Sequence, residues 1–366
     1  MHHLVTIDQK EEWKGYVSDS VQHDFYHTWY YHSLDRSGTP ILFVYEEGEN
    51  YIAFPLIKRE IPRSLLYDLT SVYGYTGPIS NQRFEDLSDE FLENFKDSFL
   101  TFLRKGQHVS VFSRLHPFFD QQRVMQKFGG VHANGKTIAI DLTIPIEDQR
   151  NKYHKRLAEK IRQLRRKGYE VREANGPEDI KLFASIYTEN MQRIEASDFY
   201  LFTEEYFNDL HESNEFNSKL LLVYNQEGFA VCGAFIVCTN DIIQAHLLGT
   251  RTAYLGDSPA KLLTDEITVI GREMGAKYFH LGGGLNFKQD SLFEWKACFS
   301  DYILDFKSWR FIADQDPYTA LLEEHQIDKN EEVDFFPLYR YTKKVIESTK
   351  VYFVLFFTEH LSLCII

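Results

Sequence analysis

The sequence predicts an α/β protein with mixed sheets, built as two tandem units of related element order. Three observations indicate this class. The chain has 366 residues, which is too long for one ordinary domain and comfortable for two. Apolar runs of strand length alternate with amphipathic helical segments in both halves. The order of strands and helices is clear in the second half and recurs, less clearly, in the first. We expect domains over 1–147 and 148–345, followed by an apolar tail over 346–366.

Composition narrows the class of protein. Hydrophobic residues make up 43% of the chain and charged residues 26%, which is enough to bury a sizeable core. The net charge of −14 argues against nonspecific electrostatic binding to nucleic acid or to anionic membrane, and we expect no DNA partner. The four cysteines have no paired spacing, so a disulfide scaffold is excluded and a zinc site is not expected. With no visible signal peptide, this usage predicts a cytoplasmic protein. Aromatic residues make up 15%, a share that fills cores and also lines clefts.

The first half predicts one hairpin, one helix and several short strands. Residues 39–61 carry two apolar runs around the turn EEGEN, which is typical of a β-hairpin. Residues 84–106 have apolar side chains at helical spacing and end in Arg-Lys-Gly, which predicts a helix with a cationic last turn. The other expected segments are a strand entering a loop at 71–80, strands at 108–117 and 136–144, and a hairpin-like turn at 130–136.

A basic segment follows at 150–167, with nine Lys or Arg and a single acid. Leu157, Ile161 and Leu164 stand at helical spacing, so we predict a basic amphipathic helix that Gly168 ends. Its charges could hold the phosphates of a polynucleotide or a nucleotide-linked substrate. The alternative is a solvated face that balances an acidic protein.

The second half predicts a regular succession of elements. A helix over 177–193 is opened by Pro and acids, and one over 258–275 has Ser258 as N-cap and Pro259 at its first position. One or two helical turns are expected over 291–300. Strands are expected at 169–175, 218–225, 229–239, 242–250, 277–284 and 302–312, with the second to fourth in a meander.

The C-terminal segment 351–366 is the most apolar stretch of the chain. It has only sixteen residues and carries Glu359 and His360 near its middle, whereas a spanning helix needs about 20 apolar residues. We expect a terminal helix that packs on the body or on a partner. Peripheral membrane contact is the alternative.

The second-half order resembles the GNAT acyltransferase fold. There, two neighbouring central strands diverge and expose backbone groups to an acyl donor, and the following helix offers its N-terminus to phosphates. The resemblance makes 250–259 the phosphate-facing loop, in which Arg251 supplies charge and Gly256 and Ser258 allow close backbone approach. Asp257 and an incomplete Arg/Gln-x-x-Gly-x-Gly/Ala pattern leave a plain strand–helix connection as the alternative.

Candidate catalytic residues gather after the strand at 277–284. Gly282, Gly283 and Gly284 permit positive φ and close approach of a ligand, although a flexible turn has the same composition. His280 titrates near neutrality and could accept a proton from an attacking amine, or it is a buried hydrogen-bonded histidine. Lys296 could stabilise an oxyanion or hold a phosphate, and a solvated lysine is the alternative.

The run KYFHLGGGLNFKQDSLFEWKACFSD (277–301) resembles the closing motif of the FemAB/FemX family, with its strand, glycine loop and aromatic–Lys pair. Segments 71–80, 150–168, 191–207 and 334–341 are similar to the same family in the same order. The region also resembles proteins labelled as having a BioF2-like acetyltransferase domain. The resemblance implies two tandem GNAT-like domains with a substrate cleft between them. Family members move an aminoacyl group from aminoacyl-tRNA onto the peptide of a peptidoglycan precursor.

The resemblance also implies site residues. The aromatic–Lys pair maps onto Trp295 and Lys296, with Trp in place of the usual Phe, and engages the donor. The acceptor-binding residues are then Tyr73, Tyr75, Gly77, Arg193 and Tyr200. The family's phosphate-binding lysine has no clear equivalent in 25–36, and the long helical hairpin of some members is absent. Relatives also occur with surface-polysaccharide synthesis genes, so an amino sugar is a second acceptor class.

We therefore expect an acyl- or aminoacyltransferase that forms an amide on an amino group of a cell-wall or surface-glycan precursor. The acceptor is a small molecule or is linked to a nucleotide or lipid. The donor is aminoacyl-tRNA, which would make tRNA a partner, or acyl-CoA, and we expect no tightly bound cofactor and no metal. The alternative is a non-catalytic double-GNAT scaffold of cell-envelope assembly.

Overall fold

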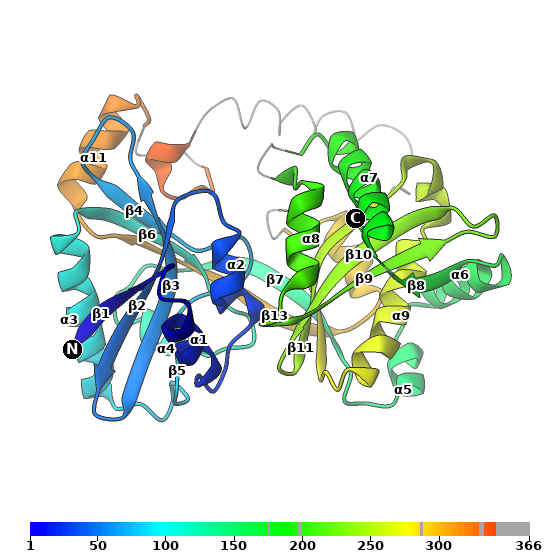
Figure 1. The fold of residues 1–366 in the computed structure, drawn as a ribbon, viewed down its shortest axis with the longest axis horizontal. Coiled ribbons are helices and arrows are strands. Elements are labelled where there is room, and N and C mark those ends of the chain that lie inside the picture. Colours follow the sequence, from blue (N-terminus) through cyan, green and yellow to red (C-terminus); the bar gives the residue numbers. More distant parts are fainter. Residues whose placement is uncertain (175, 197–199, 286–287, 329–332, 342–366) are drawn as a thin grey trace. The chain divides into compact units, whose positions relative to one another are not determined.

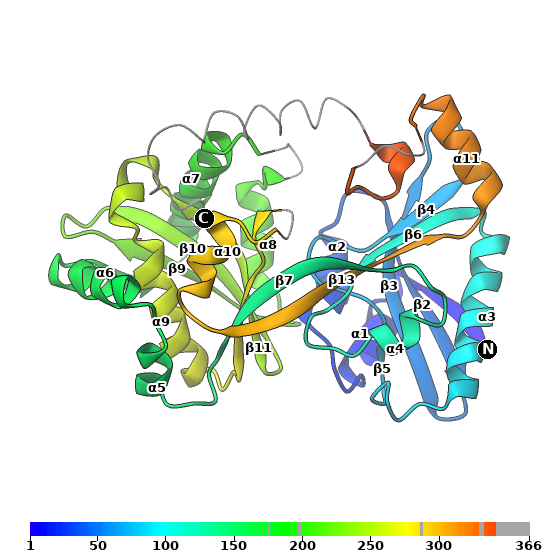
Figure 2. The ribbon, with the colours of Figure 1, turned by 180° about the vertical axis from the view of Figure 1, so that it is seen from behind.

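The computed structural model describes residues 1–174, 176–196, 200–285, 288–328 and 333–341 (Figures 1 and 2). These residues form two compact units. Unit 1 contains residues 1–134 and 306–341, and unit 2 contains residues 135–305, apart from the gaps just given. The chain thus returns to unit 1 after unit 2, which differs from the expected succession of 1–147 and 148–345. The apolar tail at 346–366 lies outside the described residues.

The sheet of unit 1 is mainly antiparallel. Its order is β1 (His2–Thr6), β2 (Thr39–Glu47), β3 (Asn50–Glu60), β4 (Tyr67–Thr70), β6 (His108–Arg114) and β13 (Tyr302–Ile312), with β5 (Ile79–Ser80) on β3. Only β4 and β6 pair in parallel within this order. The hairpin predicted at 39–61 is confirmed. The strand predicted at the start of 71–80 is wrong, because only Ile79 and Ser80 pair with β3.

Helices cover both faces of the unit 1 sheet. Helix α3 (Asp89–Lys105) buries four phenylalanines against Phe43 and Phe54, and the Ser88 side chain caps its first turn. The opposite face packs on α1 (Lys10–Ser18) through Trp13. The remaining helical elements are η1 (Phe25–His27), α2 (Trp29–Ser33), α4 (Gln122–Met125), α11 (Gln315–Glu324) and η5 (Leu338–Arg340). Much of the aromatic excess therefore fills this core.

The sheet of unit 2 has the order β7 (Val131–Asp141), β12 (Tyr278–Gly282), β11 (Ile242–Thr250), β10 (Ala230–Thr239), β9 (Asn217–Tyr224) and β8 (Glu170–Glu173). β11 and β12 are parallel, and the other neighbours are antiparallel. The predicted meander is confirmed. The turn predicted at 130–136 is wrong, because those residues continue into β7, the strand that leads from one unit to the other.

Two layers of helices cover the unit 2 sheet. α6 (Lys155–Arg166), α9 (Ala260–Glu273) and α10 (Ser291–Ala297) share one apolar cluster with Ile243 and Phe279, and the short helix α5 (Ile146–Asn151) precedes α6. On the other face, α7 (Pro177–Arg193) and α8 (Glu204–Glu212) pack Phe183 and Phe207 on Phe235 of β10, with ring centroids 5.2 and 5.8 Å apart. Figures 1 and 2 show the two layers from opposite sides.

Glycines set the distance between α7 and the sheet. Gly233 of β10 and Gly249 of β11 face each other in register. A Cβ on Gly249 would lie 3.1 Å from the Tyr187 Cα, and one on Gly233 would lie 2.8 Å from the Phe183 ring. The helix backbone therefore rests almost directly on the centre of the sheet, which a side chain at either position would prevent.

Two predicted helix boundaries are wrong. The single basic helix at 150–167 is interrupted at 152–154, where the Tyr153 hydroxyl donates to the buried Asp265 of α9. The expected Ser258 N-cap is a left-handed residue with φ 55°. Its hydroxyl donates to Leu255 O, because the 3₁₀ turn η3 (Thr252–Asp257) ends there. Helix α9 therefore starts after Pro259, without a side-chain cap.

Candidate functional site

Strands β11 and β12 separate at their C-terminal ends. Their parallel ladder has three rungs, from Ile242–Tyr278 to Gln244–His280. β11 continues to Thr250 beside β10, and β12 continues to Gly282 beside β7. Beyond the last rung, β11 thus stays paired with β10 and β12 stays paired with β7, but β11 and β12 no longer pair with each other. In an α/β sheet, such an opening beyond the carboxyl ends of parallel strands is where ligands bind.

Polar side chains stand on the α7/α8 face of the sheet beside this opening. His280 is 1% exposed, and its Nδ1 lies 2.8 Å from Gln244 Oε1. The register of β10 with β11 shifts at His246, whose Nε2 lies 3.2 Å from the Tyr206 hydroxyl of α8. Burial lowers the pKa of His246 to about 3, so this imidazole is neutral at physiological pH.

The sequence analysis predicted His280 as a site residue but did not predict Gln244, His246 or Tyr206. The signal that could have found them is the alternation in IIQAHLLGT (242–250), where Gln244 and His246 interrupt a strand of otherwise apolar or small residues. A buried polar residue in such a strand needs hydrogen-bond partners. Gln244 and His246 find theirs on β12 and α8, which are remote in sequence.

Lys296 lies on α10 and faces back to the glycine loop. Its Nζ donates to the Gly283 carbonyl at 2.6 Å. Burial lowers the pKa of Lys296 from 10.5 to about 8, although part of the side chain reaches the surface and Asp290 opposes the shift. A lysine with this pKa is still mainly cationic at neutral pH. It keeps two N–H donors beyond the one bound to Gly283.

The backbone conformation and close contacts of the glycine loop (Gly282–Gly284) explain why glycine occurs at two of its positions. Gly282 has φ 77°, a left-handed conformation. A Cβ on Gly284 would come within 2.1 Å of Lys288 O and 2.3 Å of the Asp290 carboxylate, which also caps α10. The loop is thereby folded tightly onto the start of α10, so the interpretation as a merely flexible turn does not fit its contacts.

Trp295 is a core residue of unit 2. It is 8% exposed, and its ring lies 5.0 Å from the ring of Phe299. Its indole Nε1 is buried and has no hydrogen-bond partner among the described residues. The side chain therefore supports the helix that carries Lys296, and this placement does not favour stacking on a nucleobase.

The structure gives Arg251 a different set of partners from the expected phosphate. Its guanidinium donates to Glu189 at 3.0 Å, Ser185 at 2.8 Å and the Ala230 carbonyl at 3.1 Å. Glu189 also accepts the Thr252 N–H at 2.8 Å. Arg251 thus fastens the start of the 250–259 loop to α7, which occupies three of its five donors.

Helix α6 and its C-cap residue Lys167 supply cations beside the other end of that loop. Lys167 lies 2.9 Å from the Asp257 carboxylate, which also accepts the Tyr169 hydroxyl at 2.7 Å. These contacts lower the pKa of Asp257. Lys160 donates to the Gly256 carbonyl at 3.2 Å. The loop therefore meets positive charge that the sequence had not assigned to it, and Asp257 neutralises part of that charge.

Most other basic residues of α6 pair with acids. The contacts are Arg165 with Asp265 and Glu266, and Arg162 and Arg166 with Glu159. Arg150 of α5 also binds Asp265, at 2.8 Å. These pairs fit the interpretation of a charge-balanced face better than that of a polynucleotide surface.

The predicted acceptor loop in unit 1 is rigidly held. Tyr73 and Tyr75 are partly exposed in a segment whose other residues, 71–80, are buried. Gly77 has φ 92°, and a Cβ there would lie 2.4 Å from the Gln121 side chain. The Gln121 amide donates to the Thr76 and Pro78 carbonyls at 2.7 and 2.9 Å. The loop thus presents two tyrosines from a fixed backbone.

The two remaining predicted acceptor residues lie in unit 2, by the end of α7. Arg193 is the last residue of α7 and donates to Asn190 Oδ1 at 2.7 Å, while burial lowers its pKa. The Tyr200 carbonyl accepts the Tyr187 hydroxyl at 3.0 Å.

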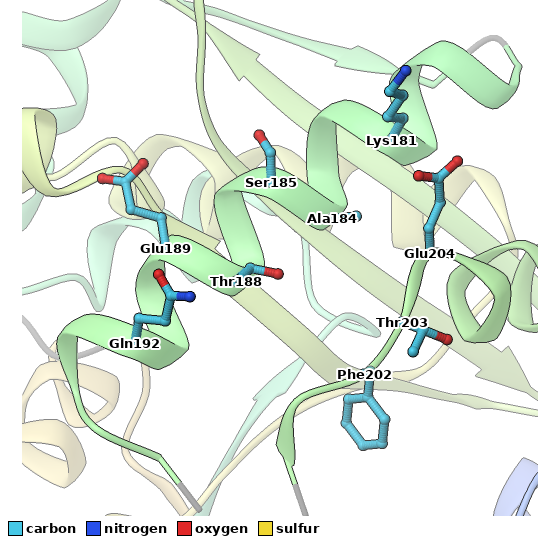
Figure 3. Close-up of a pocket in the computed structure, with 9 residues that line it drawn as sticks. All are labelled: Lys181, Ala184, Ser185, Thr188, Glu189, Gln192, Phe202, Thr203 and Glu204. Carbon is cyan, nitrogen blue, oxygen red and sulfur yellow. The ribbon is translucent and has the colours of Figure 1, made fainter. Parts of the chain in front are cut away.

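A pocket of about 510 Å³ lies on the outer side of α7, between that helix and Phe202–Glu204 (Figure 3). Ser185 and Glu189, which bind Arg251, line it. None of the predicted site residues does, so this pocket is separate from the strand opening.

Three further features concern the described part of the chain. No helix there is long and apolar enough to cross a membrane. Within the same residues, no group of three or more His, Cys, Asp or Glu is arranged to hold a metal ion. Cys232 is a buried free thiol. Cys364 and the predicted membrane contact of the tail lie outside the described residues.

Comparison with known proteins gives one family match and several similar structures. Residues 151–297 match the family described as an acetyltransferase (GNAT) domain. No curated protein matches the chain. The solved structure of FemX has a TM-score of 0.67 and 13% identity, and the match covers 87% of this chain and 99% of FemX. L-PGS from Bacillus licheniformis has a TM-score of 0.57 and 15% identity, covering 87% and 96%.

A third structure gives a similar match. It is the C-terminal domain of a putative lysylphosphatidylglycerol synthetase from Agrobacterium fabrum, with a TM-score of 0.56 and 15% identity, covering 86% of this chain and 96% of that one. At these identities the likeness concerns the fold. With the family match, the chain is an acyltransferase that carries a GNAT domain over residues 151–297 and has a FemAB-like double GNAT fold.

Proposed function

We propose that this acyltransferase forms an amide on an amino group of a cell-envelope precursor, with its chemistry at the opening between β11 and β12. The observation that carries the proposal is the pairing of that opening with two suitable groups. His280 stands on the last rung of the ladder, and Lys296 bonds to the loop that follows β12. Perturbed lysines of this kind are typical of functional sites.

In the proposed reaction, the acceptor amine attacks the carbonyl carbon of the acyl donor, and a C–N bond forms as the carbonyl becomes an oxyanion. His280 accepts the proton that the amine loses. The Lys296 ammonium stabilises the oxyanion through its N–H donors. Collapse of the intermediate breaks the bond to the leaving thiol or hydroxyl, which takes up a proton. Trp295 keeps α10 in place for Lys296.

The donor is an acyl-CoA or an aminoacyl-tRNA. The GNAT family match makes acyl-CoA the first donor to test, and the FemX-like fold makes aminoacyl-tRNA the second. We propose that Gly256 and Ser258, at the start of α9, face the donor phosphates, with Gly282, Gly283 and Gly284 beside the acyl group. Lys160 and Lys167 offer more accessible charge than Arg251 does.

We propose that the acceptor-binding residues are Tyr73, Tyr75, Gly77, Arg193 and Tyr200, as the FemAB/FemX resemblance implies. Partly exposed tyrosines on a rigid loop suit a sugar or peptide, because their rings offer contact area at little entropic cost. The candidates are the peptide amine of a peptidoglycan precursor and the amine of an amino sugar. A cytoplasmic location, where both would be made, stays a prediction.

Radiolabelled transfer tests the proposal. The purified protein is incubated with acetyl-CoA or with a mixture of aminoacyl-tRNAs, and with either a nucleotide-linked muramoyl peptide or a nucleotide-linked amino sugar. Transfer from tRNA should vanish after ribonuclease treatment, and transfer from acetyl-CoA should not. Lys296→Ala should lose at least about 100-fold in rate, whereas Lys155→Ala, an exposed lysine of α6, should keep it. Full transfer by Lys296→Ala would remove the assignment.

A further inference from the structure

One hydrogen bond joins the side chains on the last rung between β11 and β12. Gln244 and His280 are register partners there, and the Gln244 Oε1 lies 2.8 Å from the His280 Nδ1. Both residues are almost completely buried, Gln244 at 2% and His280 at 1% exposure. The bond therefore forms in an environment where a misplaced polar group is costly.

The chemistry of the two groups fixes the direction of this bond. An amide oxygen only accepts hydrogen bonds, so the imidazole has to donate through Nδ1. In a neutral histidine, a proton on Nδ1 leaves the lone pair on Nε2. The nitrogen that can act as a base is then the one remote from Gln244. Without such a partner, imidazole in water prefers the opposite tautomer, with its proton on Nε2.

The position in the sheet also restricts the ring. Ile243 and Phe279, the preceding rung, point into the apolar cluster shared with α9 and α10. By strand alternation, Gln244 and His280 point to the opposite face, toward α7 and α8. The backbone of both residues is held by the ladder, so the amide approaches the imidazole from a fixed place.

We infer that Gln244 is a positioning residue that holds His280 in the Nδ1–H tautomer, so that Nε2 is the proton acceptor at the strand opening. This inference deepens the proposed function and rests on it for the role of His280. It extends the site to a residue that acts through His280. A glutamine with a merely structural role would bridge the strands without setting the tautomer.

The tautomer can be measured without any substrate. The full chain is labelled with ¹⁵N-histidine, and long-range ¹H–¹⁵N spectra show which ring nitrogen carries the proton. The signals of His280 are those absent from the spectrum of His280→Gln. In the wild-type protein we expect the proton on Nδ1. A proton on Nε2 of His280 would overturn the inference, and this result needs no Gln244 variant to fold.

Two variants test the cause. Gln244→Leu removes the acceptor and should move at least half of the His280 population to the Nε2–H tautomer. Gln244→Glu keeps an acceptor oxygen and should retain Nδ1–H. Gln149→Leu is the matched control, since Gln149 is also 2% exposed but donates to the Tyr153 hydroxyl. An unchanged His280 tautomer in Gln244→Leu would overturn the inference.

The tautomer measurement and the transfer assay of His280→Gln together distinguish failure of this inference from failure of the proposed function. If His280 shows the expected tautomer but His280→Gln keeps full transfer, then His280 is not the base and Gln244 still sets its tautomer. If His280→Gln abolishes transfer but the wild-type tautomer is Nε2–H, the site assignment stands and the role given to Gln244 is wrong.

Discussion

Replacing Lys296 with methionine should stabilise the protein while it abolishes transfer. The reason lies in the environment of the ammonium, which burial makes unfavourable enough to lower its pKa from 10.5 to about 8. Methionine has a similar length, no charge and a good fit to an apolar surrounding. A group kept at an energetic cost in this way is typical of an active site.

The size of the effect follows from three terms. A pKa lowered from 10.5 to about 8 corresponds to roughly 3 kcal/mol against the charged form in the folded state. Because part of the side chain is exposed, solvent screens the penalty, and we take about half of it. Loss of the hydrogen bond to Gly283 O costs about 0.5–1 kcal/mol. The expected net gain in the free energy of unfolding is about 1 kcal/mol at pH 7.

The gain should depend on pH in a defined direction. The folded pKa lies below the unfolded one, so the penalty is complete below pH 8 and disappears as the pH rises toward 10.5. Urea unfolding, followed by tryptophan fluorescence, gives the free energy of each variant at pH 7 and pH 9.5. The advantage of Lys296→Met over the wild type should fall to about zero at pH 9.5.

Lys155→Met makes the same chemical change at an exposed position of α6 and should alter stability by less than about 0.5 kcal/mol at either pH. A loss of more than about 1 kcal/mol in Lys296→Met at pH 7, with Lys155→Met unchanged, would refute the reasoning. That result would mean that the Lys296 ammonium stabilises the folded protein, whereas the reasoning above requires it to destabilise the folded protein.

Three further predictions concern other parts of the chain. Burial lowers the pKa of His32 to about 4 and of His246 to about 3, so their contribution to stability is complete above pH 6.5 and is lost as the pH falls. Between pH 6.5 and 5 the two together should cost about 3 kcal/mol in urea unfolding. Substitution of both by glutamine should reduce the total loss by that amount, and the remainder comes from other buried histidines such as His108, whose pKa burial lowers to about 4. Gly77→Ala should cost about 2–4 kcal/mol, because its φ is 92° and the methyl group would meet the amide that holds the loop. Gly48→Ala, with φ 62° and open space, should cost about 1–2 kcal/mol, and equal losses would contradict the packing argument. Asp257→Asn should tighten binding of coenzyme A by about three- to tenfold in calorimetry, since it removes a negative charge beside two lysines, and unchanged affinity would place the donor phosphates elsewhere.

Local sequence patterns were enough to predict the bounds of an element where its start, stop and periodicity signals agree. The helix predicted at 177–193 has the observed bounds, because Pro177, the acids after it and the apolar spacing all point to the same segment. The failures lie where tertiary contacts override local preference. Ser258 has the residue type of an N-cap, but the 3₁₀ turn before it directs its hydroxyl backward. Residues 130–136 look like a turn, yet Gly130 accepts a bond from Arg310 of β13, and the next residues continue as β7.

For the site, the sequence alone determined the parts that lie close together along the chain. His280, the three glycines and Lys296 occur within seventeen residues, and their order suggests a strand, a loop and a helix that meet. Only the tertiary structure decided what each group touches. Lys296 folds back onto Gly283, Arg251 binds Glu189, and Gln244 reaches His280 across a strand pair separated by 36 residues. Hydrogen bonds and burial depend on distance in space, and residue type at one position does not encode the partner at another.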